Sequence, residues 1–175
     1  VEQAGGSFDL VKEYTLVSND VLLALRLEHR QGPGLQGSLL LLNGSSMGPH
    51  LPADKKTTFD VLTVAHITGN SYNAALTASM FSSSTGYETH VTPEWIALHG
   101  RYYFKALRGE KRQYNAHFLN KRDLVTNYPV SALEIPFQLP AAGVAESKFI
   151  YSFLPKNRDL LNTLSDATGL QWYQI

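Results

Sequence analysis

Residues Pro93–Asn120 read PEWIALHGRYYFKALRGEKRQYNAHFLN. This pattern predicts two extended segments joined by a tight turn at residues 108–111, in which Gly109 supplies the positive φ that such a turn needs. Trp, Tyr, Phe and Ile flank the turn, and these residues favour a pleated, half-buried surface. With the turn centred there, Lys105 lies opposite Tyr114. We therefore expect a basic, aromatic β-hairpin at the centre of the chain.

Strand and turn signals recur through the rest of the sequence. Phe8–Ser18 reads as a strand that meets the turn pair Asn19-Asp20. Val21–His29 places alternate apolar residues on one face, and Leu35–Leu42 resumes after Gly-Pro-Gly, so these two segments are expected to form a hairpin. A total of roughly eight or nine strands predicts a mainly β fold, an antiparallel sandwich or barrel, with a jelly-roll-like arrangement as one alternative.

One helix is expected, over Pro155–Thr168 near the C-terminus. Asn157 is a suitable N-cap, Asp159 lies in the first turn, and leucines follow at helical spacing. The length of 175 residues fits one domain. We expect it to span residues 8–175, after a flexible N-terminal arm at residues 1–7. The chain begins without Met, so we expect a processed mature chain or an excised domain.

Several classes of chemistry have no sequence signal. The chain has no cysteine, which excludes disulfides, thiolate nucleophiles and Cys-ligated metals but leaves the compartment open. Phosphate-binding loops, dinucleotide fingerprints, zinc-protease motifs and nucleophile elbows are all absent from the sequence. No apolar run approaches the roughly 18 residues of a membrane span. We therefore expect no catalytic residue, no metal site, no cofactor and no membrane span.

Positive charge is concentrated in one stretch although the net charge is zero. Residues 101–122 carry seven basic side chains against one acidic side chain. Basic side chains neutralise phosphates and exposed aromatic rings stack on bases, whereas an acidic protein would fit the same patch, and a charged edge can also be merely solvated. The candidate binding residues are Arg101, Tyr103, Lys105, Arg108, Lys111, Arg112, Lys121 and Arg122.

The favoured hypothesis is a non-catalytic interaction or assembly module. It would bind a macromolecular partner, another protein or further copies of itself, through the basic hairpin and loops such as Asn43–Lys56. One alternative is a polyanion- or nucleic-acid-binding domain, and another is a small-ligand barrel, which would need a large apolar cavity. The last is a small hydrolase acting on a phosphodiester or glycan, which would require a pocket that gathers side chains from among His66, His90, His99, His117, Glu88 and Glu94.

Overall fold

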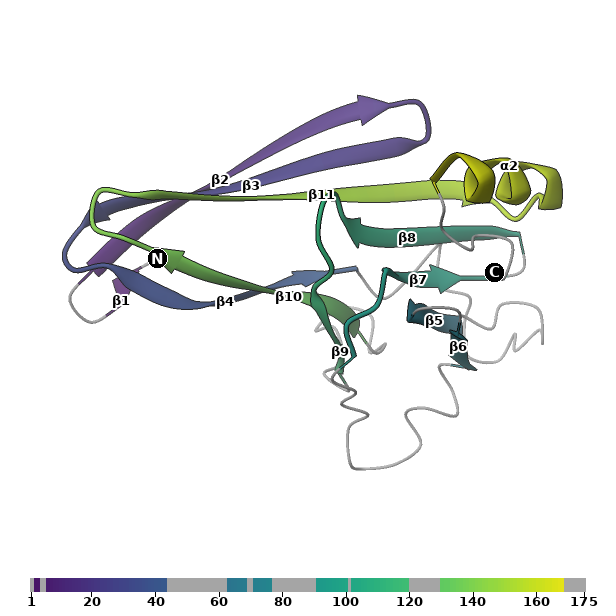
Figure 1. Cartoon of the computed structure of the whole chain (residues 1–175), viewed down its shortest axis with the longest axis horizontal. Coiled ribbons are helices and arrows are strands. Elements are labelled where there is room, and N and C mark those ends of the chain that lie inside the picture. The colour runs from purple at the N-terminus through teal and green to yellow at the C-terminus, as the bar shows by residue number, and fades with distance from the viewer. Residues whose placement is uncertain are drawn as a thin grey trace, which may run out of the picture.

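The computed structural model describes residues 2–3, 6–43, 63–68, 71–76, 91–100, 102–119 and 130–168. All the strand pairs among them are antiparallel. The expected mainly β, antiparallel fold with one C-terminal helix is confirmed (Figure 1). The described elements are β1 (Glu2–Gln3), β2 (Gly6–Val17), β3 (Asp20–Gln31), β4 (Leu35–Leu42), β5 (Thr63–Thr68), β6 (Ser71–Leu76), β7 (Trp95–His99), β8 (Tyr103–Gly109), β9 (Asn115–Leu119), β10 (Val130–Leu139), β11 (Val144–Pro155) and α2 (Arg158–Thr168).

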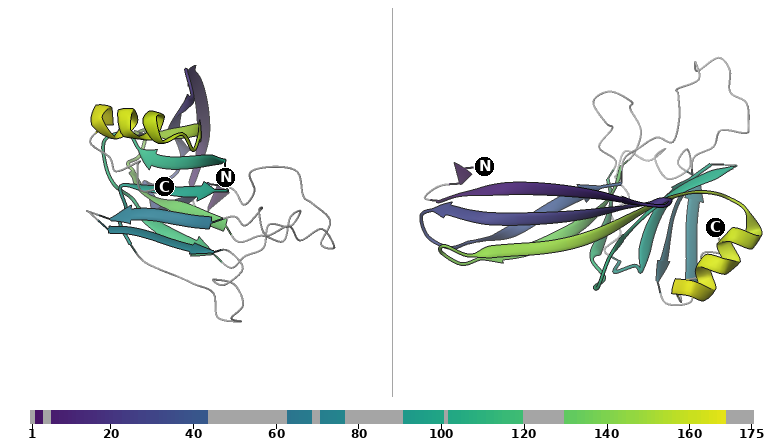
Figure 2. Two further views of the ribbon diagram at one scale, coloured as in Figure 1. Left: turned by 90° about the vertical axis from the view of Figure 1, so that its right-hand side faces the viewer. Right: turned by 90° about the horizontal axis from the view of Figure 1, so that it is seen from above.

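The strands form two sheets that share an apolar core. The larger sheet has eight strands in the order β1-β2-β3-β11-β8-β7-β5-β6, and the smaller has three in the order β4-β10-β9. The long strands make up one end of the molecule, and the short strands with α2 make up the other (Figure 2). Both sheets supply side chains to the core between them: Leu23, Leu25, Ile96, Leu98, Leu107 and Phe149 from the larger, and Ala116, Phe118, Leu133 and Ile135 from the smaller, with Tyr114 from the segment before β9.

The helix α2 covers part of the opposite face of the larger sheet. Leu161 is buried there against a cluster that includes Trp95 and Phe104. The side chain of Asn157 caps the helix, because its Oδ1 accepts hydrogen bonds from the backbone N–H groups of Asp159 at 3.0 Å and Leu160 at 3.2 Å. The predicted helix and its N-cap are confirmed, although the helix begins at Arg158 because β11 continues to Pro155.

The predicted turn between Phe8–Ser18 and Val21–His29 exists, but it lies one residue earlier than Asn19-Asp20, because Asp20 already belongs to β3. Val17 pairs with Asp20, so Ser18 and Asn19 alone connect two strands of 12 residues each. Ser18 adopts a φ of 54°, the left-handed conformation that a two-residue hairpin turn requires at one position or both.

The predicted hairpin between Val21–His29 and Leu35–Leu42 is wrong, although both strands exist. β3 pairs with β2 and β11, whereas β4 pairs with β10 in the other sheet. Gly32, with a φ of 92°, lies in the connection that takes the chain from one sheet to the other. Leu27 of β3 and Leu35 of β4 belong to one buried apolar cluster, although the two strands are not paired.

The predicted central hairpin is also wrong. β8 pairs with β7 and β11, β9 pairs with β10, and Lys105 lies opposite Leu98 and Phe153 instead of Tyr114. Gly109 ends β8 without a positive φ. A Cβ at Gly109 would collide with the carbonyl oxygen of Arg112 and the ring of Tyr114, so glycine is required for close approach and not for a turn.

The first residues of the chain take part in the larger sheet. Glu2 pairs with Ser7 and Gln3 pairs with Gly6, while the flexibility expected for residues 1–7 stays a prediction. Residues 44–56 of the expected surface loop lie outside the described part of the chain. Among the described residues, no helix is both long and apolar enough to cross a membrane.

Candidate binding groove

Side chains on the inner face of β2 become more exposed to solvent from the start of the strand to its end. Alternate residues of a strand share a face, so Phe8, Leu10, Lys12, Tyr14 and Leu16 follow one another on the side that faces the smaller sheet. The exposed fraction rises along this face, from 6% at Phe8 to 38% at Leu10, 63% at Tyr14 and 80% at Leu16. The apolar face of the sandwich therefore continues onto a part of β2 that no described residue covers.

The two strands that border this open side are edge strands. β2 pairs with β3 on one side and only through Gly6 and Ser7 with β1 on the other, and β4 pairs with β10 alone. No described strand pairs with the remaining edge of either one. An exposed edge with unpaired N–H and C=O groups and apolar side chains is a natural site for contact with another molecule.

An apolar groove of about 620 Å³ lies between these strands. Its volume falls within the ~300–1,000 Å³ typical of ligand pockets. Among the described residues of its wall, the ionisable side chains are those of two lysines and two tyrosines, and none is a carboxylate. Its lining comprises Leu10, Lys12, Tyr14, Val21, Leu23, Leu25, Leu39, Leu40, Leu41, Leu42, Asn43, Lys105, Ile135, Tyr151 and Phe153.

The polar groups of the groove include Lys105, Asn43 and Tyr151. Burial lowers the pKa of Lys105, and within the described part of the chain no hydrogen bond or ion pair reaches its ammonium group. Asn43 is only 1% exposed, and neither polar atom of its side chain has a hydrogen-bond partner. The hydroxyl of Tyr151 donates to the carbonyl of Leu42 at 3.1 Å, and burial, followed by the proximity of Tyr14, raises the pKa of Tyr151 to about 12.

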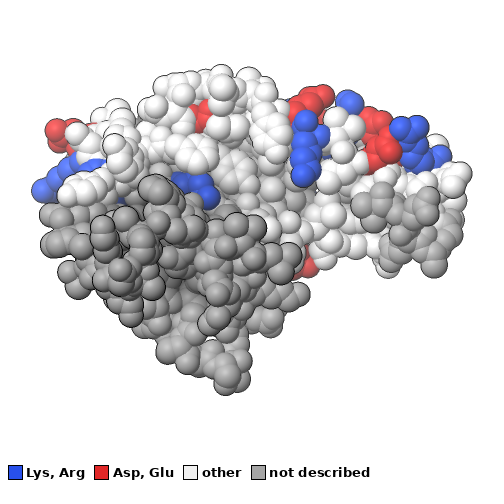
Figure 3. Space-filling view, turned by 180° about the vertical axis from the view of Figure 1, so that it is seen from behind, with Lys and Arg blue, Asp and Glu red and all other residues white. Residues whose placement is uncertain are grey.

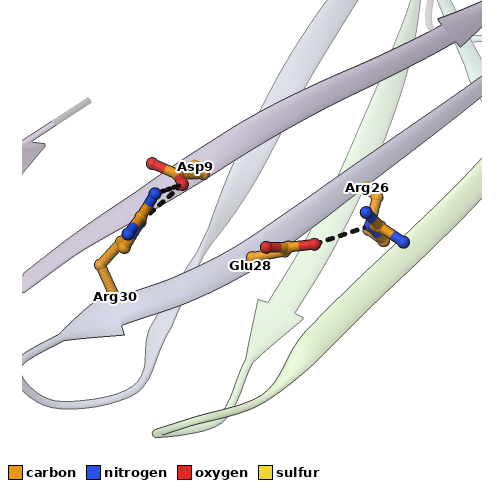
Figure 4. A network of polar contacts seen from close by, with 4 residues as sticks. All are labelled: Asp9, Arg26, Glu28 and Arg30. Carbon is orange, nitrogen blue, oxygen red and sulfur yellow. Dashed lines mark hydrogen bonds and ion pairs between the residues drawn. The ribbon is translucent and has the colours of Figure 1, made fainter.

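The opposite face of β2 and β3 is charged and solvated. Arg30 pairs with Asp9, and Arg26 pairs with Glu28 at 2.8 Å (Figure 4). Exposed ion pairs of this kind contribute little stability. Seen from behind, the described surface carries Lys, Arg, Asp and Glu toward both ends, with uncharged residues covering most of the area between them (Figure 3). The two faces of the hairpin thus differ sharply in polarity.

The structure disperses the predicted binding residues that it describes. Tyr103 and Lys105 share a face of β8, as expected, whereas Arg108 belongs to the other face, where burial lowers its pKa. Lys111 and Arg112 are exposed after the strand, and the Arg112 guanidinium lies 4.6 Å from the centre of the Tyr114 ring. Of the five described residues of the predicted set, only Lys105 lines the groove. The binding roles of all eight predicted residues stay a prediction. The residues outside the described part of the chain are Arg101, Lys121 and Arg122.

A second polar cluster surrounds His99 on the face of the sheet that α2 covers. Nδ1 of His99 lies 3.2 Å from the ammonium of Lys156, which can only donate, so Nδ1 accepts. The neutral ring then carries its proton on Nε2 and donates to the Tyr72 hydroxyl at 2.9 Å. Burial above all, and then the charge of Lys156, lowers the pKa of His99 to about 4. This cluster holds no carboxylate and ties β6, β7 and the start of α2 together.

The described histidines do not converge. His66 faces the inter-sheet core, where its ring lies 5.4 Å from that of Phe118, whereas His99 is on the opposite face of the same sheet. His117 pairs with Glu134 at 2.8 Å in the smaller sheet. Glu88 and His90 lie outside the described residues. No group of three or more possible metal ligands occurs within the described ranges.

Sequence reasoning missed the groove because its described walls come from six strands in two sheets. The available signal was the alternation of apolar residues along β2 up to Leu16, beyond what a covered strand needs. Comparison with known proteins adds no further information: no protein-family model matches the chain, and no curated protein shows significant similarity to its sequence.

Proposed function

We propose that the chain is a non-catalytic interaction or assembly module whose partner covers the inner face of the β2–β3 hairpin. The single observation that carries the proposal is the rise in exposure from Phe8 to Leu16 on one face of β2. Apolar side chains in a regular alternation normally lie against another layer, because burial of their surface contributes about 25 cal/mol per Å². A protein partner, another copy included, supplies that layer.

The edge geometry supports the same proposal. Between Leu10 and Val17 the strand carries only Lys12 and Glu13 as charged residues, so it lacks the row of charges that usually protects a long edge strand from association. A strand of the partner could form hydrogen bonds with the unpaired backbone groups of this edge, and an apolar surface of the partner could pack on the exposed side chains of Tyr14 and Leu16.

The alternatives have less support among the described residues. A polyanion surface would gather its cations on one face, but Lys105 and Arg108 belong to opposite faces of β8. A hydrolase would need acid–base groups in one pocket, but His66 and His99 lie on opposite faces of the larger sheet. Neither a polyanion-binding surface nor a hydrolase site would account for the exposed apolar inner face of β2.

Site-specific photocrosslinking tests the proposal. Benzoylphenylalanine is introduced in place of Leu16 on the inner face, or in place of Thr15 on the outer face of the same exposed strand segment. Irradiation of the pure protein tests for contact between copies, and irradiation in the native cell tests for contact with a different protein. We expect a discrete adduct from position 16 and none from position 15. Equal adducts from both positions, or no adduct in either setting, would overturn the proposal.

A further inference from the structure

We propose that the groove between β2 and β4 binds a long-chain carboxylate, with its acyl chain along the leucines and its carboxylate at Lys105. The groove overlaps the partner surface proposed above at Leu10 and Tyr14, whereas Leu16 belongs to the partner surface alone, because the groove lining does not include it. Binding of a small ligand to the isolated chain requires no second protein. The inference therefore does not depend on the identity or existence of a protein partner.

The shape and lining of the groove suit an acyl chain. Two successive stretches of wall, Val21–Leu25 and Leu39–Leu42, contribute apolar side chains from facing sheets. Further along, Phe153 stacks on Tyr151 with ring centres 6.3 Å apart. An unbranched hydrocarbon chain can follow such a channel without placing any polar atom against it.

Charge complementarity favours an anionic head group. Lys105 is partly buried beside Phe153, and within the described ranges it has no carboxylate to offset its charge. Lys12 is the other charged side chain of the described lining, so the described walls of the groove present positive charge alone. A desolvated ammonium group is costly unless an anion pairs with it. A carboxylate would supply that anion.

Asn43 gives a second, independent indication of a polar ligand group. Its side chain belongs to the groove lining and is almost fully buried, yet its donor and acceptor atoms are both without partners. Buried amides are ordinarily hydrogen-bonded, because an unsatisfied one costs about 1–3 kcal/mol. The Nδ2 group of Asn43 can donate a hydrogen bond to a ligand oxygen.

Calorimetric titration of the pure, full chain tests this assignment with four probes below their micelle concentrations. Dodecanoate carries both the chain and the carboxylate, 1-dodecanol lacks the charge, dodecyltrimethylammonium reverses it, and butanoate lacks the long chain. We expect saturable binding of dodecanoate, at least about tenfold tighter than that of any other probe. Because this comparison uses the wild-type chain, it does not depend on the folding of a variant.

Variants then locate the carboxylate. Lys105→Gln should weaken dodecanoate binding about tenfold, because it removes the positive charge. Lys105→Arg keeps the charge and should preserve binding. Leu16→Lys alters the proposed partner surface but no residue of the groove lining, so it should leave dodecanoate binding unchanged. Absence of dodecanoate binding, equal binding of 1-dodecanol, or wild-type affinity in Lys105→Gln would overturn the inference. Any of these results leaves the crosslinking test of the partner surface intact, so the two proposals fail separately.

Discussion

His99 shows how one buried residue links protonation to stability. It lies at the end of β7 between the Tyr72 hydroxyl from β6 and the Lys156 ammonium that precedes α2. Protonation of His99 would place two positive charges next to each other in a buried site and would remove the acceptor that Lys156 uses. The neutral ring is therefore part of the folded structure, and its pKa of about 4 lies below the ordinary 6.5.

The stability of the protein should consequently fall as the pH is lowered from about 6.5 to about 4. Over that range the unfolded chain binds a proton at His99 that the folded chain does not, so the free energy of unfolding decreases. With about 1.4 kcal/mol per pKa unit, the loss attributable to His99 is roughly 3 kcal/mol. Urea denaturation at several pH values measures it.

His99→Gln provides the control for this pH dependence. Glutamine can donate and accept hydrogen bonds but does not titrate, so the difference between the wild-type and variant curves isolates His99 from His66, whose pKa is also lowered by burial. Parallel curves for the two proteins would contradict the structural account of this site.

At the scale of elements, the strands and the helix could be predicted but their partners could not. Alternation indicated β3 and β4 and helical spacing indicated α2, because those signals are local. Pairing depends on which edges meet in space, and the short connections after β3 and β8 lead into the other sheet rather than into a hairpin. The sequence alone cannot distinguish a glycine required by close neighbours, such as Gly109, from a glycine required by a turn.

The crossing from β8 to β9 can be tested at Gly109. Gly109→Ala should lower the free energy of unfolding by about 1–3 kcal/mol, because its Cβ would overlap the carbonyl of Arg112 and the ring of Tyr114. The matched control is Gly100→Ala, since a Cβ at Gly100 meets no atom within 4 Å. Chemical denaturation of both variants measures the effect. Equal stability of the two alanine variants would show that the close approach at Gly109 is absent.

At the scale of the whole molecule, the central feature is a sandwich whose two sheets differ in extent. The larger sheet continues into the β2–β3 hairpin beyond the cover of β4 and β10, which leaves an apolar face and a groove open along one side. No single segment of sequence contains this feature, because it arises from the unequal widths of two sheets. Among the described basic residues of the central stretch, only Lys105 lines the groove.

Thiol accessibility measures this feature most directly, because the chain has no cysteine of its own. Single substitutions Phe8→Cys, Leu10→Cys, Tyr14→Cys and Leu16→Cys are labelled with a maleimide, with Thr15→Cys as the exposed control on the other face. The structure predicts labelling rates that rise from position 8 to position 16, with position 16 as reactive as position 15. Protection of position 16 to the level of position 8 would mean that the chain covers this face itself, and it would contradict the account.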